Sequence, residues 1–146
     1  MDTLKMNAGE TPAEMIFVRL HPGEEVHACL RELAKREGIP SATVSGLGAV
    51  NDIVLALFDP AEKRYLETRL TEDLEVVSMT GNLAWAEGEP IAHLHGVVSK
   101  ADCSTAAGHI MKAVVSVTLE ISLLVGSARM ERRLDPDFPL KLLHLR

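Results

Sequence analysis

The chain has 146 residues, of which 47% are hydrophobic, and a formal net charge of −6 at pH 7. This length suits one domain with its own core, and no 18-residue apolar run exists that could form a membrane-spanning helix. Proteins bind DNA mainly by neutralising phosphates with Lys and Arg, so this acidic balance disfavours strong DNA binding. Residues 129–133 (RMERR) form a weak basic candidate, for which a solvated strand edge is the simpler interpretation.

The N-terminal residues 1–14 show no basic start followed by an apolar stretch, so they do not resemble a secretory signal. We expect them to form a flexible lead-in. The two cysteines, Cys29 and Cys103, require no disulfide and are expected to be small buried or half-buried residues. Two thiols without a signal peptide favour a reducing, cytoplasmic setting.

In chain order, a short β-type run at residues 15–20 (MIFVRL) precedes the clearest helix, in residues 24–38. Gly38 can end that helix in a left-handed conformation, and Pro40 prevents its continuation. One face of the helix is apolar because four residues fall at helical spacing: Val26, Leu30, Leu33 and Ala34.

From residue 41 onward the hydrophobic period changes from about 3.6 to 2, which is typical of strands. Asn51 and Asp52 favour turns, so residues 41–59 are interpreted as two strands joined there. Further strands are predicted at 65–70, 74–85, 91–98 and 115–123.

These elements predict an α+β (α/β) fold, with one main helix on a bent, mainly antiparallel sheet. The domain is expected to span residues 15–134. The apolar tail, residues 135–146, is expected either to dock on the domain or to cover a neighbouring subunit.

Several familiar catalytic motifs are absent. Gly46 and Gly48 lack the third glycine and the following helix that a dinucleotide site needs, so they more simply permit a bulge or a close backbone approach. No nucleophile elbow, CxxC, HExxH or phosphate loop is present.

The histidines are the strongest chemical signal. His93 and His95 lie two residues apart on a predicted strand, so their side chains point to the same face. His109 follows Ala-Ala-Gly, interpreted as a loop that can fold it back toward the pair. Three neutral imidazoles suit zinc, and less selectively nickel, copper or iron, and they leave one coordination position open. The simpler alternative is a polar strand face without a metal.

Taken together, the segments HLHGVVSKAD…AAGHI, SGLGAVNDIVLALFD, EVVSMTGNLA and VTLEISLLV resemble the plant and prokaryote conserved (PPC) domain, over about residues 15–133. The resemblance implies a compact fold with one main helix, assembled as a homotrimer. It also implies that His93, His95 and His109 match family histidines, which in some prokaryotic members cluster near subunit boundaries and can hold a metal. Glu120 matches the glutamate of a T-x-E strand.

Two departures from the plant members of the family bear on DNA binding. The AT-hook that precedes the plant domain is absent, and the plant Gly-Arg-Phe-Glu-Ile-Leu segment corresponds to residues 72–77, EDLEVV, where acidic residues replace its glycine and arginine. A DNA-binding label for this chain would therefore rest on analogy.

Two functional hypotheses follow. In the first, the protein is a stand-alone PPC module, a homotrimer with a binding or regulatory role, a metal or small-ligand site at the three histidines, and a protein or weakly bound DNA as partner. In the second, it is a metal-dependent enzyme of hydrolase or lyase type, in which His93, His95 and His109 hold the ion, most simply zinc. Glu120 would then act as the base for a metal-bound water, or as an acceptor behind the ligands.

Overall fold

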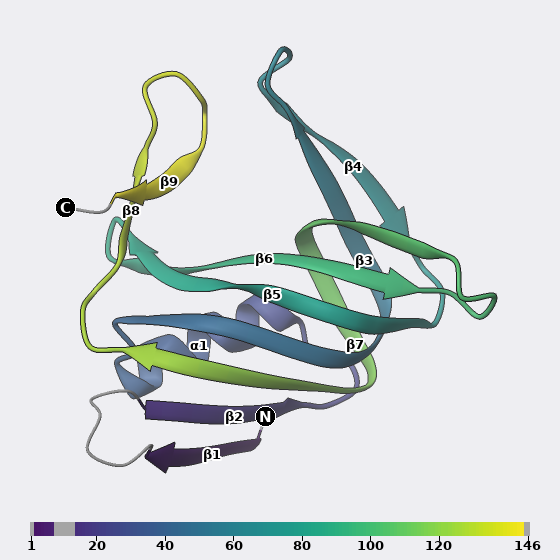
Figure 1. The fold of residues 1–146 in the computed structure, drawn as a ribbon, viewed down its shortest axis with the longest axis horizontal. Coiled ribbons are helices and arrows are strands. Elements are labelled where there is room, and N and C mark those ends of the chain that lie inside the picture. Colours follow the sequence, from purple (N-terminus) through teal and green to yellow (C-terminus); the bar gives the residue numbers. More distant parts are fainter. Residues whose placement is uncertain (1, 8–13, 145–146) are drawn as a thin grey trace.

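The computed structural model describes residues 2–7 and 14–144, and Figure 1 shows how their elements are arranged. The one helix of these residues, α1, spans Val26–Glu37. The strands are β1 (Asp2–Asn7), β2 (Glu14–Leu20), β3 (Ser41–Asp59), β4 (Arg64–Leu70), β5 (Leu74–Ala86), β6 (Glu89–Ser99), β7 (Thr105–Gly126), β8 (Glu131–Leu134) and β9 (Lys141–His144).

The predicted α+β class was wrong, because the sheet dominates the fold. Strands contain 67% of the described residues and the helix 9%. The sheet is also mixed rather than simply antiparallel, since β8 runs parallel to β5 where Trp85 pairs with Glu131.

The prediction underestimated the strand content in part because the turn expected at Asn51 and Asp52 does not form. β3 continues through these residues, and register shifts against β7 between Gly48 and Asp52 absorb the bend. Gly48 makes this geometry feasible: its φ is +148°, and a Cβ there would lie 2.2 Å from the carbonyl oxygen of Thr118. The prediction of a bulge or close approach at this glycine pair is confirmed.

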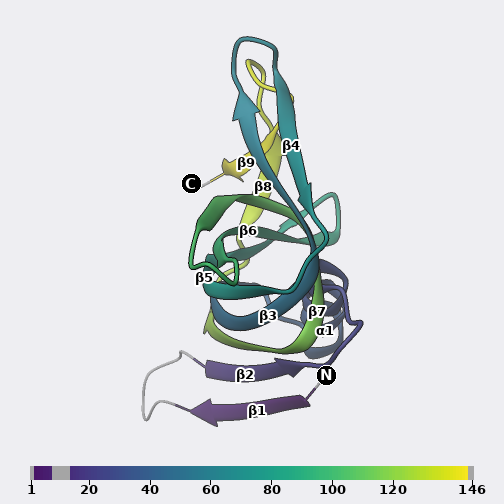
Figure 2. The ribbon, with the colours of Figure 1, turned by 90° about the vertical axis from the view of Figure 1, so that its right-hand side faces the viewer.

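Four strands close into a ring that is visible end-on in Figure 2. β3 pairs with β5 and β7, and β6 pairs with the same two strands from the other side. β2 and β1 extend the sheet beyond β7, and β4 extends β3 into a long hairpin arm. β8 and β9 form a C-terminal hairpin beside β5. Arm and hairpin project from the same side of the ring (Figure 1).

The helix was predicted in its observed place. Its apolar face is buried as expected, with Val26, Leu30 and Leu33 inaccessible to solvent. Glu25 caps its N-terminus by accepting hydrogen bonds from the backbone of His27 and Ala28, and Gly38 ends it with a left-handed φ of 64°. The helix packs against β6 and β7, which places it next to the two strands that carry the histidines.

The two ends of the chain also contribute strands. Residues 2–7 of the predicted lead-in form β1, which pairs antiparallel with β2, while residues 8–13 lie outside the described part. In the tail, residues 141–144 form β9, which pairs with β8. No helix within residues 2–7 and 14–144 has the length and apolarity that crossing a membrane requires.

Candidate metal site

Strand pairing brings the three predicted histidines together. On β6, His93 and His95 share one face while Leu94, between them, points inward and is fully buried. On β7, His109 is the direct cross-strand partner of His95. The expected Gly-rich loop is not a loop: residues 105–109 are already part of β7, so sheet register rather than a turn delivers the third imidazole.

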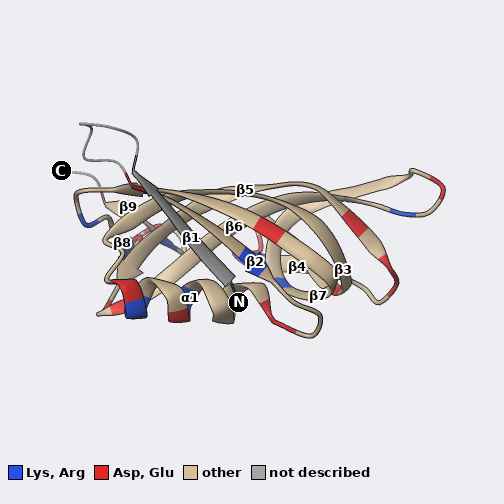
Figure 3. Ribbon diagram, turned by 90° about the horizontal axis from the view of Figure 1, so that it is seen from below, with Lys and Arg blue, Asp and Glu red and all other residues tan. Residues whose placement is uncertain are grey.

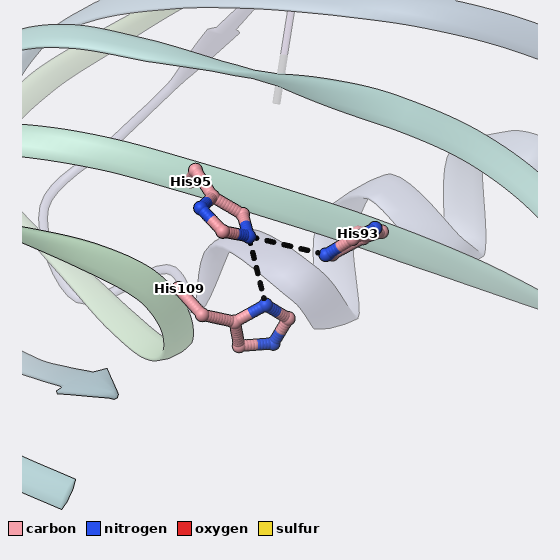
Figure 4. Close-up of side chains that lie close together, drawn as sticks. All are labelled: His93, His95 and His109. Atoms are coloured by element: carbon pink, nitrogen blue, oxygen red, sulfur yellow. Dashed lines mark hydrogen bonds between the residues drawn. The ribbon is translucent and has the colours of Figure 1, made fainter. Parts of the chain in front are cut away.

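The three rings converge through their nitrogens (Figure 4). His95 Nε2 lies 3.2 Å from His93 Nε2 and 3.4 Å from His109 Nδ1. One ligand nitrogen from each residue lies within 4.8 Å of the others. In a tetrahedral site with zinc–nitrogen bonds of about 2.0–2.1 Å, ligand nitrogens are separated by about 3.3 Å. The two short separations therefore match a tetrahedral ion, and the donor set is one that could hold a metal.

The surroundings keep two of these imidazoles neutral. Burial, the Arg132 guanidinium and His95 together lower the pKa of His93 to about 4. Burial, with the charges of His93 and His95, lowers the pKa of His109 to about 4 as well. At neutral pH both rings are uncharged, which is the form that binds a metal.

Arg132 is the residue at this site that sequence reasoning missed. It was read as part of an exposed basic run, yet only 7% of it is accessible to solvent. Its Nη2 donates to Asn82 Oδ1 (2.7 Å) and to His93 Nδ1 (3.0 Å), and its Nη1 donates to the Lys141 carbonyl (3.0 Å). No local signal could reveal this, because β8 reaches His93 across 39 residues of sequence.

A cavity of about 210 Å³ adjoins the cluster, beneath the arm and the C-terminal hairpin. Its walls include Tyr65, His93, His109, Arg132, Leu140 and Leu142. The arm and the hairpin contact each other: Phe58 meets Phe138 edge to face, and Lys63 Nζ donates to the Asp137 carbonyl (2.8 Å). The cavity thus depends on segments that are far apart in sequence.

Glu120, the predicted base, lies elsewhere in the chain. It sits on β7 opposite Arg19 and Leu47, eleven residues beyond His109. There it lines a second hollow of about 550 Å³ with the exposed apolar side chains of Phe17, Leu47 and Val77. Within one chain the structure brings the histidines together and does not add this glutamate to them.

Comparison with known protein families identifies the family of the chain. Residues 8–127 match the Plants and Prokaryotes Conserved (PCC) domain, the domain called PPC above. The chain belongs to this family. Comparison with curated proteins gave no significant match.

Solved structures share the whole PPC fold. A "putative DNA-binding protein" from Ralstonia eutropha is 29% identical, with a TM-score of 0.85 over 97% of this chain and 96% of its own. A protein of the same description from Bacteroides thetaiotaomicron is 26% identical, with the same TM-score and coverage. A "metal-containing protein" from Archaeoglobus fulgidus is 28% identical, with a TM-score of 0.82 over 90% of this chain and 93% of its own.

Proposed function

We propose that this PPC protein is a homotrimeric binding module with a regulatory role, in which His93, His95 and His109 hold a divalent transition metal. The convergence of three imidazole nitrogens carries the proposal. Zinc fits best, because imidazoles are typical zinc ligands, two of the nitrogen separations match a tetrahedral ion, and three ligands leave a position for a further one. The 28% identical relative from Archaeoglobus fulgidus is described as containing a metal, which supports a metal site in this fold.

An exposed apolar surface supports self-assembly. Phe17, Leu47 and Val77 line one hollow on the sheet and are 41%, 58% and 58% exposed. Contiguous exposed apolar surface is typical of protein–protein contacts and of ligand-binding grooves. Three copies of the chain can cover one another there, in line with the trimer that the family resemblance implies. Light scattering tests the trimer, which requires three times the chain mass of 15.9 kDa.

DNA is the weaker partner candidate, although two relatives carry a DNA-binding description. The basic run at 129–133 does not form a patch: Arg129 stacks on Trp85 and pairs with Glu131, and Arg132 is buried. Figure 3 shows acidic and basic positions interspersed on the helix side of the molecule. Binding to phosphates without a basic surface is weak and falls steeply with salt. We therefore favour protein or small-ligand partners, within a cytoplasm whose reducing conditions suit the two free cysteines.

Metal-dependent catalysis is the alternative role. The three histidines leave an open position for a water, but the proposed base Glu120 stands apart from them within one chain. A catalytic role for this glutamate would require that it come from a neighbouring subunit. We regard a binding role as better supported.

Metal analysis of protein made without a histidine tag tests the proposal. We expect about one zinc per chain in the wild type and less than a third of an equivalent in His95→Ala, because His95 contacts both other imidazoles. His144→Ala, which removes an exposed histidine on β9, is the matched control and should retain its metal. Equal metal content in the wild type and His95→Ala would overturn the metal site.

A further inference from the structure

The guanidinium of Arg132 is a buried cation without a paired anion. Arg132 is more than nine-tenths buried, and no carboxylate of the described residues pairs with its guanidinium. Its three hydrogen-bond acceptors, namely the Asn82 amide, the Lys141 carbonyl and the His93 ring, are all neutral groups. A buried charge in a folded protein is ordinarily paired, because desolvation without a counter-charge is costly.

The guanidinium also has N–H donors that reach no protein acceptor. It carries five N–H groups, and three of them reach the acceptors just named. The Nε–H is buried and has no partner. Arg132 lines the 210 Å³ cavity next to His93 and His109, so an anion in that cavity would lie beside a positive charge that no carboxylate of the described residues offsets.

We propose that this cavity binds a small organic carboxylate, held by Arg132 and lying against the histidine cluster. The carboxylate supplies the missing counter-charge and accepts hydrogen bonds from the guanidinium. Its apolar body lies against Tyr65, Leu140 and Leu142, which line the same cavity.

A phosphate fits this cavity less well. A phosphate carries more charge and three strongly accepting oxygens, whereas Arg132 has only two N–H groups that reach no protein acceptor. The other cation of the lining, Lys141, already pairs with Glu87 at 2.7 Å. One remaining charge and apolar walls match a singly charged carboxylate with a hydrophobic body.

A coupling between carboxylate binding and metal binding is also expected, and this part rests on the proposed function. In this structure His93 Nδ1 accepts from Arg132, which leaves the ring proton on Nε2. If His93 binds a metal through Nε2, its Nδ1 must carry the proton and can no longer accept. One more guanidinium N–H is then released toward an anion, so zinc and carboxylate should strengthen each other's binding.

Calorimetric titration of the full-length, tag-free protein with benzoate tests the inference, with neutral benzamide of the same shape as control. We expect benzoate to bind the zinc-loaded protein at one site per chain, and benzamide at least tenfold more weakly. Arg132→Gln should weaken benzoate binding at least tenfold. Arg133→Gln, its exposed neighbour on β8, should leave binding unchanged.

Three results would overturn the inference: equal affinities for benzoate and benzamide, unchanged benzoate affinity in a folded Arg132→Gln variant, or tighter binding of inorganic phosphate than of benzoate. The benzoate and benzamide comparison uses the wild type alone, so it decides the question even if Arg132→Gln does not fold. Titration after dialysis against EDTA separates the two proposals, because Arg132-dependent benzoate binding should persist there in weaker form. Such binding in a protein that takes up no zinc would defeat the metal site and leave the carboxylate site standing.

Discussion

Replacing Glu25 by glutamine tests how the helix is fixed to the sheet that carries the histidines. The Glu25 carboxylate accepts hydrogen bonds from the backbone of His27 (3.2 Å) and Ala28 (2.7 Å), and from the Ala113 N–H on β7 (3.4 Å). Burial alone would raise the pKa of Glu25, but hydrogen bonds from His27 and Ala28 outweigh it and lower the pKa from 4.5 to about 2. Glutamine keeps one acceptor oxygen, but it removes the charge and replaces the other oxygen with an NH2 donor.

The size of the effect follows from linkage. A pKa lowered by about 2.5 units corresponds to at most about 3.4 kcal/mol of folding free energy at pH 7, at about 1.36 kcal/mol per unit. Because 27% of the side chain is exposed, solvent screening reduces this, and we expect about 1–2 kcal/mol. A lowered pKa stabilises the fold above pH 4.5, and that stability is lost as the pH falls through 2. The difference between wild type and Glu25→Gln should therefore shrink to less than half by pH 3.

Urea unfolding followed by circular dichroism measures this difference, at one fixed protein concentration because oligomerisation shifts apparent stability. Glu32→Gln, an exposed position on the same helix, is the control and should change stability by less than about 0.5 kcal/mol. A loss that is the same at pH 7 and pH 3 would show that the charge of Glu25 does not stabilise the helix. The reasoning from its hydrogen bonds would then fail.

Two further substitutions test the sheet. Gly81→Ala would place a Cβ 1.9 Å from the His93 carbonyl oxygen. We therefore expect it to destabilise the fold by at least about 2 kcal/mol in urea unfolding and to weaken zinc binding. Wild-type stability in this variant would contradict the close approach of β5 and β6. Leu47→Glu should convert the proposed trimer to monomers in light scattering, whereas Leu57→Glu, on the arm and 69% exposed, should leave it intact. A trimer that survives Leu47→Glu would show that the interface lies elsewhere.

Local patterns predicted local structure well. Contacts within a few residues decide the position of the helix, its apolar face and its C-terminal end at Gly38, and all three were found where expected. The alternation along β6 likewise placed His93 and His95 on one face and Leu94 in the core. The failures came where local and long-range preferences disagree. Asn51 and Asp52 favour a turn, but pairing with β7 on one side holds β3 extended through them.

The sequence by itself determined the period of each element, and with it the identity of the buried faces and of the paired imidazoles. Only the tertiary structure decided that β7 pairs with β6 in the register that sets His109 opposite His95, and that a C-terminal hairpin delivers Arg132 to the same place. The physical reason is that side-chain direction is set by the neighbouring peptide bonds, whereas register and strand order depend on hydrogen bonds between segments far apart in the chain.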